Sequence, residues 1–323
     1  MCTRTTGGTA VTSGSARISE LLPQPFPTGY RCRPSTAADA ASVHGLVVAC
    51  ECALHGRAVT DADRVAAELT PAGTQRGATL LVLDSAGGTA GWASVRGRRA
   101  RVEVHPGHRG RGLGGALLAW TETRARELGS DRLAQTVPDA DRAAGALLRS
   151  GGYARLVTEW LLEIALPDEP EVPEPPAGVT VRPFRHGDEQ AAYQLTEDAF
   201  DEWQPRRKTY PQWARETVER AGFAPAASPV AFAGGQMVGA VLSLDVPEHD
   251  GGYVERVAVR RDHRDRGIAR LLLRDAFRTF HRRGEPACTL WTHSGTGALS
   301  LYERLGMTVR RSSTVYGKPL VTE

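Results

Sequence analysis

Two segments rich in arginine and glycine have the residue types that bind phosphate. They contain Arg109, Gly112 and Gly114 in one case and Arg264, Gly267 and Ala269 in the other. Each follows a β-branched run and leads directly into an apolar helical pattern. A helix start offers unpaired backbone N–H groups and a positive dipole end to an anion, and glycine lets the backbone approach closely. We therefore expect both segments to form anion-binding loops.

Two common nucleotide motifs do not account for these loops. The P-loop needs Gly-Lys followed by Ser or Thr, and the sequence has only Gly317-Lys318 followed by proline. The dinucleotide fingerprint occurs once, as Gly110, Gly112 and Gly115, but late in its half of the chain. The second loop lacks it entirely. A loop that is present twice needs an explanation that fits both copies.

The pattern shared by both loops resembles that of the GNAT superfamily of N-acyltransferases, in which this loop grips the pyrophosphate of coenzyme A. The resemblance implies acetyl-CoA or another acyl-pantetheine thioester as donor, and no metal. It assigns the loop residues Arg264, Asp265, Arg266, Gly267, Ile268 and Ala269 to donor binding, with Arg109, Gly112 and Gly114 as the first-half counterparts. In that superfamily the backbone of the preceding strand pairs with the pantetheine arm, which here implicates Val257, Ala258 and Val259.

A tyrosine distinguishes the two halves. The run from Leu301 to Met307, LYERLGM, resembles the superfamily's Leu-Tyr-x-x-x-Gly-Phe segment, whose tyrosine protonates the departing thiolate. A phenol with a pKa near 10 is a suitable donor to such a group. Tyr302 is therefore the predicted general acid, and the alternative is a tyrosine packed between helix and sheet. The first-half counterpart is Leu148, so we expect that half to be a degenerate copy with a structural or substrate-shaping part.

The acceptor amine needs a base before it attacks the thioester. Glu255 alternates with Val257 and Val259, so simple strand periodicity places it on their side. It is the predicted base, and the alternative is a strand-end ion pair with Arg256. His249, Asp250 and His293 are further candidates. The resemblance also implies an oxyanion site at the backbone N–H near Val259. Ser294 and Thr296 stand where the superfamily often has an asparagine that touches the pantetheine arm.

The helices and strands that position the candidate site residues occur twice in the sequence. Each half opens with Arg-Pro (Arg33 and Arg182), continues with a helical pattern, and has an apolar hairpin whose second strand contains Gly91 or Gly239. Four such correspondences recur in the same order, 148 to 155 residues apart. Each half reads helix, helix, hairpin, strand, helix, strand, helix, strand.

The sequence therefore predicts an α/β (α+β) fold class with two tandem GNAT-like domains, each a mixed central sheet flanked by helices. We expect a disordered tail at 1–26, a first domain at 27–166, a stiff Pro/Glu linker at 167–178 and a C-terminal catalytic domain at 179–323. With two copies and the expected active half at its C-terminus, this sequence resembles the mycothiol synthase-like members of the superfamily.

The composition bears on which classes of partner and which cellular location are expected. There are 40 basic and 37 acidic residues, and aromatics are 6%, so nucleic acid is not expected. No apolar run approaches the roughly 20 residues that span a membrane. Five cysteines without a C-x-x-C pair indicate neither a zinc site nor a disulfide framework, and the expected location is the cytoplasm.

The acceptor is expected to be the primary amine of a small molecule. In this fold the first two helices shape its site, here Asp198 to Trp213 with its acids and aromatics. These are Asp198, Phe200, Asp201, Glu202, Trp203, Tyr210 and Trp213. Acids beside aromatic rings suit a cationic amine, and they equally suit an amphipathic helix. The pair Arg206-Arg207 favours an acidic partner or the donor's phosphates. An acyl carrier protein as donor, or a non-catalytic acyl-CoA sensor, is the alternative reading.

Overall fold

The computed structural model describes residues 26–58, 60–69, 78–201, 207–245 and 251–320. Two compact units divide the chain. The first unit comprises Met1–Leu156 with Thr314–Glu323, and the second unit comprises Val157–Ser313. The tail expected at 1–26 lies outside the described residues except for Phe26, which packs against the core of the first unit.

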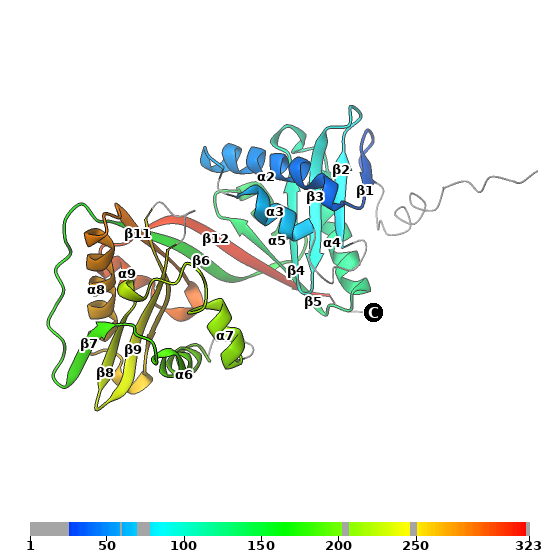
Figure 1. Cartoon of the computed structure of the whole chain (residues 1–323). Helices are drawn as coiled ribbons and strands as arrows, with labels where there is room; N and C mark the ends of the chain where they lie inside the picture. Colours follow the sequence, from blue (N-terminus) through cyan, green and yellow to red (C-terminus); the bar gives the residue numbers. More distant parts are fainter. Residues whose placement is uncertain (1–25, 59, 70–77, 202–206, 246–250, 321–323) are drawn as a thin grey trace, which may run out of the picture. The chain divides into compact units, whose positions relative to one another are not determined.

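The first unit follows the element order expected from the sequence, after a short opening strand (Figure 1). Its elements are β1 (Arg31–Arg33), η1 (Ala37–Asp39), α2 (Ala40–His55), α3 (Ala62–Leu69), β2 (Thr79–Leu83), β3 (Thr89–Arg96), β4 (Arg99–Val104), η2 (Pro106–His108), α4 (Leu113–Glu127), β5 (Arg132–Pro138) and α5 (Arg142–Ser150). The strand β6 (Ala154–Ala165) then leaves this unit after Leu156.

The second unit repeats the same order. Its elements are β7 (Val179–Pro183), α6 (Glu189–Phe200), α7 (Tyr210–Glu216), η3 (Pro225–Ala227), β8 (Pro229–Ala233), β9 (Gln236–Leu244), β10 (Gly252–Val259), η4 (Arg261–His263), α8 (Ile268–Arg282), β11 (Ala287–His293), η5 (Ser294–Thr296), α9 (Leu299–Arg304) and β12 (Thr308–Pro319). Both hairpins expected at the Gly-Gly pairs are present, because β2 pairs with β3 and β8 with β9, each antiparallel.

The last strand of each half begins in its own unit and continues into the unit of the other half. In the second unit β6 pairs antiparallel with β11, from Ala287 with Ala165 to His293 with Glu159. In the first unit the end of β12 is the neighbour of β5, and Leu320 N donates to Asp131 O at 2.8 Å. The compact units therefore differ from the ranges 27–166 and 179–323. Residues 157–166 lie in the second unit, and residues 314–320 in the first.

The second unit has helices on both faces of its sheet (Figure 1). On one face α8 packs Leu272, Phe277 and Phe280 against the strands. On the other face α6 and α7 pack Leu195 and Trp213 against them. Burial of apolar side chains on both faces at about 25 cal/mol per Å² is the main force that holds these layers together.

The glycines at matching hairpin positions have a packing reason. A Cβ on Gly239 would lie 2.8 Å from Cγ2 of Ile268, and one on Gly91 would lie 3.1 Å from Cδ1 of Leu117. The first turns of α8 and α4 can approach their sheets only because these side chains are absent. The glycines thereby set the depth of the loop that precedes each helix.

Within the described residues one helical stretch, Ala37–His55, is long and apolar enough to cross a membrane by length and composition alone. Its buried side chains form a cluster with Leu81 and Trp92 of the sheet. In this structure one side of the stretch packs on the sheet of the first unit, and 28% of its apolar window is buried.

Candidate active site

A cleft opens in the second unit where two parallel strands part. β10 pairs with β11 only from Gly252 to Val254, although β10 continues to Val259 and β11 to His293. Past that point a cavity of about 570 Å³ lies between the diverging strands, the loop before α8, and α9. A cavity of this size is large enough for a small-molecule ligand.

The edge of β10 presents free backbone groups to this cleft. Arg260 N donates to Val238 O of β9 at 2.9 Å. Because consecutive residues of an antiparallel ladder alternate in direction, Ala258 also bonds towards β9, while Val257 and Val259 direct their N–H and C=O groups away from it. Those groups face the side from which β11 has diverged. All three residues line the cavity.

The loop before α8 has the backbone shape of an anion cradle. Asp265 and Gly267 have φ of 61° and 80°, and Asp265 is the one non-glycine with positive φ in the described part of the chain. The helix has no side-chain cap, and its first internal bond is Leu271 N to Gly267 O. The N–H groups of the first helical turn therefore have no intrahelical acceptor. Arg264, Asp265, Gly267, Ile268 and Ala269 line the cavity, whereas Arg266 is exposed and does not.

Arg264 holds this loop against the strand. Its Nε donates to Val259 O at 3.3 Å, and within the described residues its guanidinium forms no ion pair. The first-half counterpart, Arg109, makes the same contact to Val104 O at 3.4 Å, but its Nη2 also lies 3.5 Å from Asp141 Oδ2. The arginine that contacts the strand thus has a nearby carboxylate in the first loop and, within the described residues, none in the second.

Tyr302 lies in α9 and lines the cavity. The residue is 7% exposed, and burial raises the pKa of its phenol to about 12. Its hydroxyl forms no hydrogen bond to another described residue, so the proton remains in place at neutral pH and is available to a ligand. Tyr302 also packs in the core on the α8 face. The residue therefore both lines the cavity and packs between helix and sheet, the position given as the alternative.

Glu255 lines the same cavity, but simple alternation does not place it there. The register of β10 against β9 shifts between Val254 and Arg256, so Glu255 is the extra residue of a β-bulge. Its carboxylate lies near the Tyr253 hydroxyl. Burial and then this carboxylate raise the pKa of Tyr253. Glu255 therefore does not share the side of Val257 and Val259, because the bulge breaks the two-residue period. Within the described chain no ion pair joins it to Arg256.

The remaining candidates separate into three groups. His293 lines the cavity, and its Nδ1 is buried without a hydrogen-bond partner. Thr296 also lines it and bonds Thr292 through their hydroxyls at 3.0 Å, whereas Ser294 accepts from Thr158 N at 3.1 Å and is not in the lining. His249 and Asp250 lie outside the described residues.

Within the described residues, the expected acceptor region contributes Ala199 and Phe200 to this cavity. Phe200 lines it, while Trp213 is fully buried in the core and Asp198 pairs with Arg207 at 2.6 Å. Tyr210 stacks on Trp213 with ring centroids 6.3 Å apart. Glu202, Trp203 and Arg206 lie outside the described residues. Most of this region is thus the amphipathic helix pair of the alternative interpretation.

Arg256 and Trp291 are two of the cavity residues that the sequence did not assign to the site. Arg256 lines the cavity because of the bulge, and Trp291 of β11 lines it with a 41% exposed side chain. A Trp in a strand of otherwise core-like residues indicates a cavity position only weakly. The bulge that brings Arg256 to the cavity has no recognisable pattern in the sequence. Within the described part of the chain, no group of three His, Cys, Asp or Glu side chains gathers to hold a metal ion.

The first unit has the same loop but obstructed surroundings. Gly110 and Gly112 have φ of 73° and 84°, as in the second loop. A Cβ on Gly112 would lie 3.3 Å from Cγ of Pro27, so the N-terminal segment packs against the cradle. Cys50 donates through Sγ to Val104 O at 3.3 Å, so this carbonyl has a second donor besides Arg109, whereas among the hydrogen bonds of the described residues Val259 O accepts from Arg264. Leu148, in place of the tyrosine, is buried.

Comparison with known proteins agrees with this architecture. The family model described as "Acetyltransferase (GNAT) family" matches residues 62–153 and 190–307, one region in each half. A curated relative named mycothiol acetyltransferase from Thermomonospora curvata is 32% identical over 76% of this chain and 83% of its own. Another of that name from Catenulispora acidiphila is 28% identical over 68% and 72%.

Solved structures give the same result. A GCN5-related N-acetyltransferase from Sphaerobacter thermophilus superposes with a TM-score of 0.78 at 30% identity, covering 92% of this chain and 98% of its own. A tandem GNAT protein from the clavulanic acid biosynthesis pathway has a TM-score of 0.66 at 19% identity, covering 91% and 99%, and shares the fold. The chain is a tandem N-acetyltransferase that belongs to the GNAT family.

Proposed function

We propose that this enzyme transfers an acetyl group from acetyl-CoA to the primary amine of a small molecule, by direct attack of the amine on the thioester. The observation that carries the proposal is the joint lining of one cavity by Glu255, Tyr302, the free edge of β10 and the loop at Gly267. The relatives named mycothiol acetyltransferase support a small-molecule acceptor.

The residues present fit a pantetheine thioester. The N–H groups of Val257 and Val259 and the C=O group of Val257 can pair with the amides of a pantetheine arm. The first turn of α8 and Arg264 complement a pyrophosphate. An acyl group carried by such an arm would lie between the diverging strands, where β10 N–H groups can stabilise a developing oxyanion.

Glu255 would act on the attacking amine and Tyr302 on the departing thiolate. Glu255 takes a proton from the ammonium group of the acceptor, and the freed amine forms a C–N bond with the acyl carbon. The C–S bond then breaks, and the thiolate receives the Tyr302 hydroxyl proton. The nitrogen of the new amide releases its second proton to solvent, from which Tyr302 is reprotonated. Burial raises the pKa of Tyr302 to about 12, which keeps the proton on the phenol until the thiolate forms. His293 is the second candidate for the base.

The second unit would contain the single strong donor site of the chain. The first loop has the Asp141 carboxylate beside Arg109 and is abutted by Pro27, and the Val104 carbonyl of its strand accepts from Cys50. Free cysteines at 32, 50, 52 and 288 suit a reducing cytoplasm, where acetyl-CoA is available.

The test combines turnover with binding. Thiol release from acetyl-CoA is measured with a panel of small amines, and calorimetry measures acetyl-CoA binding. We expect turnover with some amines and one strong acetyl-CoA site per chain. Arg264→Gln should weaken binding about tenfold by removing one charge-assisted contact, whereas Arg109→Gln should leave it unchanged. Tight binding without any amine-dependent thiol release would instead favour a non-catalytic sensor. Turnover only with an acyl carrier protein would replace the donor.

A further inference from the structure

The β-bulge in β10 places two consecutive charged residues on one face of the sheet. Val254 and Val257 both pack on the α8 side, and Ala258 packs on the α6 side. The guanidinium carbon of Arg256 lies 5.7 Å from the ring centroid of Phe200 in α6. Glu255 is the bulged residue beside Tyr253, which alternates with Val254. An acid and an arginine that are adjacent in sequence thus face the same part of the cavity.

Within the described residues Arg256 forms no ion pair, although its guanidinium lies over the Phe200 ring. It lines the cavity, and its Nε is buried without a hydrogen-bond partner. Glu216, which pairs with Lys208 at 2.6 Å, lies within electrostatic range of Arg256, and Arg220 adds a second positive charge near Tyr253. A guanidinium in a cavity wall that has no carboxylate partner is suited to an anion that enters the cavity.

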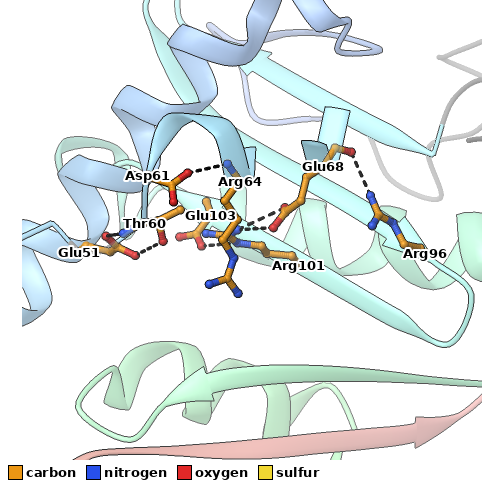
Figure 2. Close-up of polar contacts among 8 residues, drawn as sticks. All are labelled: Glu51, Thr60, Asp61, Arg64, Glu68, Arg96, Arg101 and Glu103. Carbon is orange, nitrogen blue, oxygen red and sulfur yellow. Dashed lines mark hydrogen bonds and ion pairs between the residues drawn. The ribbon is translucent and has the colours of Figure 1, made fainter. Parts of the chain in front are cut away.

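The first unit serves as an internal control. Arg101 stands three residues before Val104, just as Arg256 stands three before Val259. Arg101 is neutralised by two carboxylates, with its Nη1 3.1 Å from Glu68 and its Nε 3.0 Å from Glu103, as Figure 2 shows. The second half has Ala258 where the first has Glu103. The same arginine is therefore saturated in one copy and left open towards the cavity in the other.

We propose that Arg256 binds a carboxylate on the acceptor, so that the enzyme acetylates small amines of the amino acid class. The ammonium group would lie at Glu255 and the carboxylate at Arg256, whose planar fork matches a carboxylate in two-point contact. Adjacent Cα atoms are 3.8 Å apart, and an amino acid carries its two charges within a few bonds. Phe200 and Trp291 supply apolar walls for the rest of the acceptor. This inference rests on the proposed amine acetylation.

The experiment compares matched acceptors with wild-type enzyme. Each set contains an amino acid, its carboxamide and its decarboxylated amine, with small, aliphatic and aromatic side chains. An aminoalkyl phosphate tests whether another anion is accepted. We expect kcat/KM to be highest for members of the carboxylate series. Arg256→Gln should lower kcat/KM for them about 30-fold or more, while the carboxamides change little. The control Arg215→Gln, an exposed arginine of α7, should leave all values unchanged.

Acetyl-CoA binding by calorimetry separates this inference from the proposed function. Arg256→Gln should retain donor binding, because the loss concerns the acceptor alone. The inference is overturned if neutral amines are acetylated as well as amino acids, or if the aminoalkyl phosphate is the best acceptor, while donor binding persists. Absence of both donor binding and thiol release with every amine would instead overturn the proposed function.

Discussion

Tyr302 combines a packing position with a free hydroxyl. Tyr302 belongs to the apolar core on the α8 face and also lines the cavity, and its hydroxyl forms no hydrogen bond to another described residue. The sequence motif identified this residue, and burial then sets its chemistry. Because burial disfavours the phenolate, the raised pKa keeps Tyr302 protonated far above neutral pH.

Tyr302→Phe should lower kcat about 10- to 100-fold, because it removes one proton donor while the ring still fills its place. Acetyl-CoA affinity by calorimetry should change little. In the wild type the rate should show no loss from pH 8 to 10, since Tyr302 ionises only near pH 12. An unchanged kcat in Tyr302→Phe would remove this residue as the acid.

At the scale of elements, the loop before α8 is defined by its left-handed residues. Gly267 and Gly112 occupy the same position in the two units, with φ of 80° and 84°. A side chain there costs about 1–2 kcal/mol because its Cβ crowds the following carbonyl. Since only one of the two loops is open to a ligand, the pair allows stability and binding to be separated.

Gly267→Ala and Gly112→Ala should each lower the free energy of unfolding by about 1 kcal/mol, measured by urea titration. Only Gly267→Ala should also weaken acetyl-CoA binding in calorimetry. Equal loss of donor binding in both variants would show that the first loop takes part.

An ion pair between Arg182 and Asp188 connects β7 to the start of α6. Arg182 donates two hydrogen bonds to Asp188, at 2.7 and 2.8 Å, and Arg33 does the same for Asp39 in the first unit. The Arg182 guanidinium lowers the pKa of the Asp188 carboxyl chiefly through these hydrogen bonds. A carboxyl with a depressed native pKa stabilises the fold above its unfolded pKa of about 3.9, and the effect disappears as pH falls through the native value.

Asp188→Asn should therefore cost about 1.5–3 kcal/mol at pH 7, and the difference from the wild type should shrink as pH falls below about 4. Asp198→Asn, which removes an exposed ion pair with Arg207, should change stability by no more than about 0.5 kcal/mol. Urea titrations at pH 7 and pH 3 measure both. A gap that stays constant with pH would contradict the ionic role of Asp188.

At the scale of the whole molecule, the exchanged last strands link the two halves of the sequence. The seven-pair ladder of β6 on β11 supports one wall of the reaction cleft, and β6 comes from the first half. Without β6, β11 would present an unpaired strand edge, which favours aggregation. The second unit is therefore not encoded by residues 179–323 alone.

A protease site placed in the linker at 167–178 provides the test. After cleavage of the folded full chain, the two pieces should co-purify with activity retained, because each unit still contains strands from both. Residues 179–323 expressed alone should be insoluble or inactive, and co-expression with the first piece should restore activity. An active, monomeric 179–323 fragment would show that the exchange is dispensable.

The sequence alone determined the duplication, the order of elements, the loop at Gly267 and the choice of Tyr302. These depend on local patterns: periodicity, turn residues and spacing within one strand–loop–helix segment. The tertiary structure decided two other matters. It showed which sheet each last strand joins, because a strand pattern does not specify its partner. It also showed that a bulge turns Glu255 and Arg256 to one face, because a one-residue shift in register leaves no mark on a sequence read at period two.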